Sequence, residues 1–200
     1  MNIVIIKYNA GNIESVNNAL LRLGVQAEVT GDHEQIRKAD KVIFPGVGEA
    51  STTMAYLKKE GLDLLIPELK QPVLGICLGL QLMCSYSEEG DTPCLGIFKE
   101  TVKRFVPDKG MEYATKVPHM GWNNITNLKS ELFAPALENQ FVYFVHSYYA
   151  TVGEQTAATG NYINPFSAAL HKDNFYATQF HPEKSGTVGA RILEKFIALS

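Results

Sequence analysis

The sequence predicts an α/β fold: an open sheet in three layers, with parallel strands at its core and antiparallel additions in the C-terminal half. Over residues 3–86, short apolar runs alternate with segments whose apolar residues recur at helical spacing. This alternation is typical of parallel strands joined by helices that cover both faces of a sheet. After residue 90 the apolar runs follow one another with turn-rich links, so hairpins are expected there and the sheet should be mixed.

The first half of the chain contains the parallel core. Its predicted strands are 3–6, 25–29, 41–44 and 72–76. Its predicted helices are 13–23, 32–37, 51–59 and 78–86, with Gly24 at a C′ position and Asp32 and Ser51 as candidate N-caps. Ile3–Ile6 is a near-continuous apolar run, as expected for a strand that is buried on both faces.

The second half is dominated by strands. The predicted strands are 97–106, 114–117, 141–150, 156–162, 167–171 and 175–180. One short helix is expected at 130–137, and an amphipathic helix closes the chain at 189–199. No linker, repeat or low-complexity stretch divides the chain, so residues 1–200 are expected to form a single domain.

Composition excludes several classes of protein. The net charge is −3 with no basic stripe, which argues against a nucleic-acid partner. The apolar runs are far shorter than the roughly 20 residues that cross a membrane. The N-terminus lacks a basic n-region and reads as a strand instead of a signal peptide. Three cysteines without metal-ligand spacing predict a reduced, cytoplasmic protein with no metal site.

A candidate nucleophile lies at the junction of the fourth strand and its helix. Gly75-Ile76-Cys77-Leu78-Gly79 has the form of a nucleophile elbow, with sulfur in place of a serine oxygen. Glycines on both sides allow the strand and the helix to approach closely. The helix N-terminus favours a thiolate, and the Leu78 N–H can stabilise an oxyanion. A buried structural cysteine in a βα unit is the alternative interpretation.

A base and its orienting group are predicted near the C-terminus. His181 follows an apolar strand, where sites collect in open α/β sheets, and Pro182 fixes the backbone between it and Glu183. Glu183 can then accept a hydrogen bond from the imidazole and set its tautomer. Taken alone, His-x-Glu also fits a solvated turn. His146 is a rival base without a nearby carboxylate, so a structural role or contact with substrate is favoured for it.

Further candidates surround these groups. Val47 or Gly48, in the Pro45-Gly46-Val47-Gly48 turn, can supply a second oxyanion donor, although a plain glycine-rich turn is the alternative. Gln81 lies four residues after Cys77 on the same helix face, where it can contact a substrate. The only tryptophan, Trp122, lies in an irregular segment and suits either the core or a partner-binding surface.

These motifs together resemble the class I (triad-type) glutamine amidotransferases. The resemblance rests on the runs Pro45–Gly48, Gly75–Gln81 and His181–Glu183, in that order. It extends over the whole chain and leaves no synthetase domain, so the ammonia acceptor is expected on another protein. Within the class, four runs look like the glutaminase subunits of imidazole glycerol phosphate synthases: Tyr8–Asn12, Pro118–Asn123, His146–Tyr148 and His181–Ser185.

The resemblance implies a flavodoxin-like fold and a specific chemistry. Cys77 would form a thioester with L-glutamine and release ammonia, with His181 as acid and base and Glu183 as its orienter. No cofactor is implied. The ammonia would reach a (β/α)8-barrel cyclase subunit in a heterodimer, which converts a phosphoribulosyl formimino carboxamide into imidazole glycerol phosphate and aminoimidazole carboxamide ribotide, in histidine biosynthesis.

The resemblance also assigns binding residues. Glutamine would be bound by Gln81, by Glu89 at the α-amino group, and by His146, Ser147 and Tyr148. The partner interface would include Asn12, Trp122, Asn123, Tyr143 and Lys184. In this family the Val47 peptide is thought to reorient when the partner binds substrate, which would leave the free chain nearly inactive.

One segment departs from the family pattern. Family members commonly begin Asp-Tyr-Gly-x-Gly-Asn, whereas this chain has Lys7-Tyr8-Asn9-Ala10-Gly11-Asn12. Two other functions compete with the cyclase-linked glutaminase: a glutaminase that serves another synthase, such as pyridoxal phosphate synthase, and a flavodoxin-like binding or redox-sensing domain whose Cys77 is merely exposed.

Overall fold

A seven-stranded mixed sheet forms the centre of the computed structural model, which describes residues 1–8, 12–107, 109–110 and 115–200. Its strand order is β11-β12-β13-β4-β3-β1-β2. The parallel strands are β1 (Ile3–Ile6), β2 (Ala27–Thr30), β3 (Lys41–Gly46), β4 (Val73–Cys77) and β13 (Phe175–Thr178). The antiparallel additions are β12 (Pro165–Lys172) and β11 (Thr156–Asn161). The predicted fold class is confirmed.

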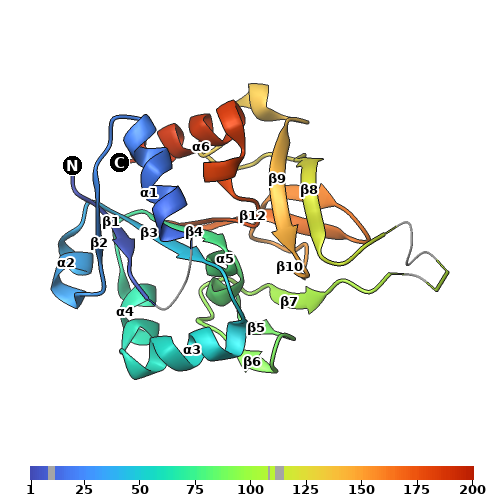
Figure 1. The fold of residues 1–200 in the computed structure, drawn as a ribbon, viewed down its shortest axis with the longest axis horizontal. Coiled ribbons are helices and arrows are strands. Elements are labelled where there is room, and N and C mark those ends of the chain that lie inside the picture. Colours follow the sequence, from blue (N-terminus) through green and yellow to red (C-terminus); the bar gives the residue numbers. More distant parts are fainter. Residues whose placement is uncertain (9–11, 108, 111–114) are drawn as a thin grey trace.

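Helices cover both faces of this sheet, as Figure 1 shows. One face carries α1 (Ile13–Arg22) and α6 (Gly186–Ala198), which pack with inward residues such as Ile5 and Leu74 into one apolar core. The opposite face carries α2 (His33–Lys38), α3 (Ala50–Lys59), α4 (Leu62–Glu68) and α5 (Leu78–Met83) over a second core. Continuous apolar runs such as Ile3–Ile6 supply alternate residues to both cores.

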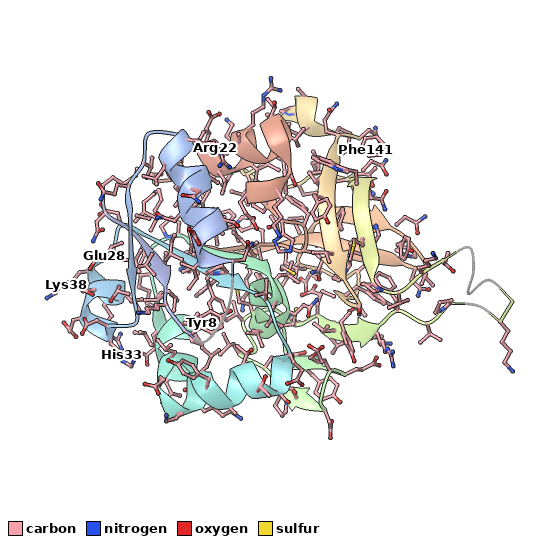
Figure 2. The ribbon with its side chains drawn as sticks, viewed as in Figure 1. Tyr8, Arg22, Glu28, His33, Lys38 and Phe141 are labelled. Atoms are coloured by element: carbon pink, nitrogen blue, oxygen red, sulfur yellow. The ribbon has the colours of Figure 1, made fainter. Side chains whose placement is uncertain are left out.

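Two smaller sheets extend the C-terminal half. One has the order β10-β7-β5-β6, with bounds Tyr148–Ala150, Thr101–Arg104, Tyr86–Ser87 and Thr92–Pro93. The other is an antiparallel ribbon of β8 (His119–Asn124) and β9 (Phe141–His146), which lies at the side of the molecule (Figure 1). Figure 2 shows Phe141 toward the outer end of β9, in contrast to Tyr8, which is buried in the body of the protein.

Several local predictions are wrong. The N-cap of α3 is Glu49, which accepts from the N–H groups of Ser51 and Thr52, so Ser51 is not the cap. The elbow helix ends at Met83 because the chain turns into β5. Of the predicted strand 97–106, only β7 forms. The predicted helix 130–137 reduces to a 3₁₀ turn, Pro135–Leu137, because proline cannot continue a helix from the preceding residues.

Two segments differ more strongly. The segment around Trp122, expected to be irregular, is strand β8, which begins directly after Pro118. The strand predicted at 114–117 does not form at residues 115–117, and Ala114 lies outside the described residues, as do Asn9, Ala10 and Gly11 of the departing segment. Helix α4 is not anticipated from the sequence. No helix in the described ranges is long and apolar enough to span a membrane.

Candidate active site

Cys77 occupies the corner between β4 and α5. Its backbone has φ 55° and ψ −108°, a conformation that L-residues rarely adopt outside strained sites. Close packing holds this corner. A Cβ on Gly79 would lie 2.1 Å from the Phe44 carbonyl oxygen, and one on Gly46 would lie 2.7 Å from the Gly79 nitrogen. The glycines therefore let β3 and α5 touch, and Gly46 is paired with Cys77 in the sheet register.

His181 and Glu183, the predicted base and its predicted orienting carboxylate, are in contact after the end of the adjacent strand. β13 ends at Thr178, and His181 immediately precedes a 3₁₀ turn, Pro182–Lys184, with Pro182 in its first position. The Nδ1 atom of His181 lies 2.7 Å from Oε1 of Glu183, and both side chains are buried. The Nε2 atom of His181 is buried without a regular hydrogen-bond partner among the described residues, and it is the ring nitrogen left for the thiol side of the site.

The thiol and the carboxylate both act on the charge of this imidazole. Burial disfavours the imidazolium, but interactions with Cys77 and Glu183 outweigh it and raise the pKa of His181. This balance favours the protonated imidazolium form of His181. The neighbouring Tyr8 hydroxyl donates to the Pro45 carbonyl, and burial followed by the charge of Cys77 raises the pKa of Tyr8, which stays neutral.

A cavity of about 330 Å³ opens over the thiol. Most of the predicted site residues line it: Val47, Gly48, Cys77, Leu78, Gln81, Glu89, His146, Ser147, Tyr148 and His181. Pro118 and Val145 complete the lining and were not anticipated. The residues predicted as oxyanion donors and substrate contacts thus lie on separate segments of the chain but line one pocket. Glu183 does not line it and contacts His181 instead.

Glu89 presents a carboxylate to this cavity. Its Oε2 accepts from the Ala50 backbone N–H at 2.9 Å, which leaves acceptor capacity on the carboxylate. Burial, helped by the charge of Glu49, raises the pKa of Glu89, although the hydrogen bond from Ala50 opposes the shift. A half-buried carboxylate in a small pocket is a suitable partner for an ammonium group.

A polar chain runs beside the nucleophile. The Nε2 atom of Gln81 donates to the Tyr148 carbonyl at 2.9 Å and to Oε1 of Gln179 at 3.0 Å. The Nε2 atom of Gln179 in turn lies 3.8 Å from the sulfur of Cys77. Because both amide hydrogens of Gln81 are used within the protein, only its Oε1 remains for a substrate, as an acceptor.

His146 is part of a buried histidine pair, so it is not a competing base. Its Nδ1 lies 2.8 Å from the Tyr148 carbonyl, and its Nε2 lies 3.0 Å from Nδ1 of His119. Burial lowers the pKa of His146 to about 3 and that of His119 to about 4. Both rings are therefore neutral near pH 7, and aromatic side chains including Phe105 and Phe144 pack around them.

The residues predicted for a partner interface are not all exposed alike. Trp122 is 55% exposed and its ring centroid lies 6.0 Å from that of Tyr143 across the ribbon. Lys184 is also exposed. Asn123 donates to the Asn161 carbonyl. The Asn12 side chain points inward and donates to Oε1 of Glu183, with His181 Nδ1 at 3.4 Å.

Sequence reasoning missed some of these roles. Gln179 lies two residues before His181 on a strand that reads as plain core, and Asn12 is 171 residues from Glu183 in the chain. For Gln179, only its position two residues before a predicted base offered a signal. For Asn12 the sequence offers no signal of the contact, because helix α1 must first pack beside the Pro182–Lys184 turn.

The chain is similar to known glutamine amidotransferases over almost its whole length. The family model for "Glutamine amidotransferase class-I" matches residues 4–199. Imidazole glycerol phosphate synthase subunits HisH from Bacteroides fragilis and Bacteroides thetaiotaomicron are 65% and 62% identical, each over 100% of both chains. The subunit HisH from Haemophilus influenzae is 45% identical over 98% of this chain and 97% of the relative.

Solved structures show the same fold at low identity. A crystal structure of a putative GMP synthase subunit from Thermoplasma acidophilum has a TM-score of 0.73 at 20% identity, covering 98% of this chain and 92% of that one. A second crystal structure, of a glutamine amidotransferase, has a TM-score of 0.72 at 19% identity, covering 97% and 96%. With matches of this extent, the chain belongs to the class I glutamine amidotransferases and, within them, to the HisH family of imidazole glycerol phosphate synthase subunits.

Proposed function

We propose that this chain hydrolyses glutamine to glutamate and ammonia at Cys77, and that it delivers the ammonia to a cyclase subunit for histidine biosynthesis. The observation that carries the proposal is the convergence of Cys77 and His181 on one cavity, with Glu183 bonded to the far nitrogen of the imidazole. This is the arrangement of a nucleophile, a base and an orienting carboxylate.

The thiolate of Cys77 attacks the side-chain amide carbon of glutamine. The negative charge that develops on the amide oxygen is stabilised by the Leu78 N–H at the start of α5 and by a second N–H from Val47 or Gly48. His181 gives its Nε2 proton to the leaving nitrogen, ammonia departs, and a thioester remains. His181 then takes a proton from water, which attacks the thioester and releases glutamate.

Glutamine is held by groups at the wall of the cavity. The carboxylate of Glu89 pairs with the α-amino group, and Oε1 of Gln81 accepts a hydrogen bond from the substrate. The segment His146–Tyr148 supports the remaining part of the glutamine. This assignment is supported by the presence of all these residues in the cavity lining.

The partner is a (β/α)8-barrel cyclase that forms a heterodimer with this chain in the cytoplasm. We place the interface on the outer face of the β8–β9 ribbon, where Trp122 and Tyr143 lie side by side, and near Lys184. Exposed aromatic side chains are typical anchors of protein–protein interfaces. Asn12, whose side chain donates to Glu183, is assigned to the triad instead.

The division of labour is tested with Cys77→Ala in the assembled complex. Synthesis of imidazole glycerol phosphate from glutamine should fall to background, whereas synthesis from added ammonia should stay within twofold of the wild type. Cys94→Ala, which removes a half-buried thiol outside the cavity, is the control and should retain both activities. Loss of both activities in an intact Cys77→Ala complex would contradict the proposal.

A further inference from the structure

Gln179 is a fully buried polar side chain that the mechanism above does not use. It follows β13 directly, and its backbone N–H is bonded to the Ala168 carbonyl at 2.8 Å. It is not among the residues that line the cavity. Its side chain nevertheless bridges two groups of the site, with Oε1 at 3.0 Å from Nε2 of Gln81 and Nε2 at 3.8 Å from the sulfur of Cys77.

The direction of this bridge is fixed by a backbone carbonyl. The backbone carbonyl oxygen of Tyr148 can only accept a hydrogen bond, so Gln81 must turn its NH₂ group toward that oxygen, at 2.9 Å. The second hydrogen of that NH₂ group points at Gln179, which must therefore present its oxygen. A flipped Gln179 would oppose two N–H groups and leave the sulfur facing a carbonyl oxygen.

The Tyr148 carbonyl oxygen has a second hydrogen-bond donor. It also accepts from Nδ1 of His146 at 2.8 Å, so this oxygen has two donors and a settled position. The donor end of Gln179 is thus aimed at Cys77 by a chain of contacts that runs through Gln81 and Tyr148. No rotation of the Gln179 amide preserves these contacts and removes the N–H from the sulfur.

The two protonation states of Cys77 use their neighbours differently. The neutral thiol can donate to the Val145 carbonyl, 3.9 Å from the sulfur, and gains little from a nearby N–H. The thiolate cannot donate, and it accepts from an N–H donor more strongly than a neutral sulfur does. A donor fixed beside the sulfur therefore favours the thiolate over the thiol.

We infer that Gln179 is a further catalytic residue, which donates a hydrogen bond to the sulfur of Cys77 and stabilises its thiolate. This inference rests on the proposed function for its meaning in glutamine hydrolysis, but the contact itself acts on Cys77 with or without glutamine. Because Gln179 does not line the cavity, its loss should lower kcat and leave KM for glutamine nearly unchanged.

The test is the pH dependence of Cys77 alkylation by iodoacetamide in the free chain, read by mass spectrometry of the peptide that contains Cys77. Gln179→Met keeps the size of the side chain and removes both its N–H donor to Cys77 and the Oε1 that accepts from Gln81. The midpoint of the alkylation profile should rise by about one pH unit, which is about a tenfold loss of thiolate at pH values below the midpoint. Gln71→Met, which removes a part-buried amide bonded to the Ile36 carbonyl, is the matched control and should not shift the midpoint.

The outcomes separate this inference from the proposed function. If folded Gln179→Met keeps the wild-type midpoint, Gln179 does not act on the thiolate. If Gln179→Met does not fold, Gln179→Asn serves instead, because it stays polar but its shorter amide withdraws from the sulfur; an unchanged midpoint there overturns the inference equally. If the midpoint rises but wild-type complex does not hydrolyse glutamine, the contact stands and the proposed function fails. In active complex, a rise in KM with unchanged kcat would also contradict the assignment.

Discussion

The side-chain amide of Asn12, at the start of α1, donates to the carboxylate of Glu183, which in turn holds the imidazole of His181. The carboxylate thus has two donors on one oxygen, one from each end of the chain. Asn12 thereby ties the start of helix α1 to the proposed triad, and residues 9–11 belong to the segment that departs from the family pattern.

Replacing Asn12 should weaken catalysis without removing it. In Asn12→Ala the Glu183 carboxylate loses the hydrogen bond that the Asn12 amide donates to it. A hydrogen bond to a charged group contributes about 1.5–3 kcal/mol. We expect kcat/KM for glutamine to fall by about tenfold or more in the complex. Asn18→Ala, on the exposed side of α1, is the control, and equal activity of the two variants would count against a role for Asn12.

Replacing Glu89 should act on substrate binding instead of chemistry. Glu89→Gln keeps the shape of the side chain but removes the charge that we assign to the α-amino group, so KM should rise about tenfold with kcat changed little. Glu88→Gln alters the exposed neighbouring residue and serves as control. A fall in kcat at constant KM in Glu89→Gln would show that the carboxylate acts elsewhere.

The raised pKa of Glu89 adds a pH signature. Since burial makes this carboxylate protonate at a higher pH than usual, KM of the wild-type complex should rise as the solution is acidified. In Glu89→Gln that rise should be absent, because the titrating group is gone.

The His119–His146 pair should make the fold sensitive to mild acid. Their folded-state pKa values, about 4 and about 3, lie below the unfolded value near 6.5, so the unfolded chain binds more protons at pH 4–6. Stability from this source is fully present above pH 6.5 and is lost as the pH falls. The raised pKa of His181 acts in a different window, above pH 6.5, where stability decreases as the pH rises.

His119→Phe tests this linkage, since a phenyl ring suits a site already stacked on Phe144 and Tyr162. Urea unfolding near pH 5 should show a slope of unfolding free energy against pH that is smaller by roughly 1 kcal/mol per pH unit than in the wild type. His33→Phe removes a histidine outside the pair and controls for substitution itself. An unchanged slope in His119→Phe would mean that this ring is protonated in the native state.

Trp122 should be an anchor for the partner protein. It is 55% exposed on the antiparallel β8–β9 ribbon, and large aromatic side chains at interface centres contribute about 2 kcal/mol or more. Trp122→Ala should therefore raise the Kd for the cyclase by roughly 30-fold or more, as measured by calorimetry. Leu64→Ala removes an apolar side chain that is 72% exposed on α4, and it should leave the Kd unchanged. Equal effects of the two variants would move the interface away from the ribbon.

The parts of the fold that sequence could predict are those set by local pattern. The alternation of apolar strands and helices places Cys77, Val47 and His181 at strand ends, and the capping residue Asp32 marks α2, where its side chain accepts from Gln35. Local competition explains the errors. Glu49 caps α3 because its longer side chain reaches two N–H groups. Strand β8 begins directly after Pro118 and continues through Gly121 because β9 supplies its hydrogen bonds.

Contacts between distant segments were beyond such reasoning. The pairing of His119 with His146 depends on the register of β8 against β9, and the Gln179 contact depends on where α5 places Gln81. A local sequence pattern predicts neither the register between distant strands nor the rotamer of a buried side chain. The sequence therefore predicted side chains that line one cavity, but not the buried contacts that Asn12 and Gln179 make beside it.

The proposed catalytic groups depend on three neighbouring strands of the central sheet. Cys77 ends β4, Gly46 ends β3, and β13 leads to His181, and these three strands are neighbours in the sheet. A slip of β13 by two residues against β4 would carry His181 about 6.6 Å along the strand, beyond reach of the sulfur. The register of the edge strands β2 and β11 does not position Cys77 or His181. Divergence is thus least restricted at the sheet margins, which suits a fold that persists in proteins only 20% identical to this chain.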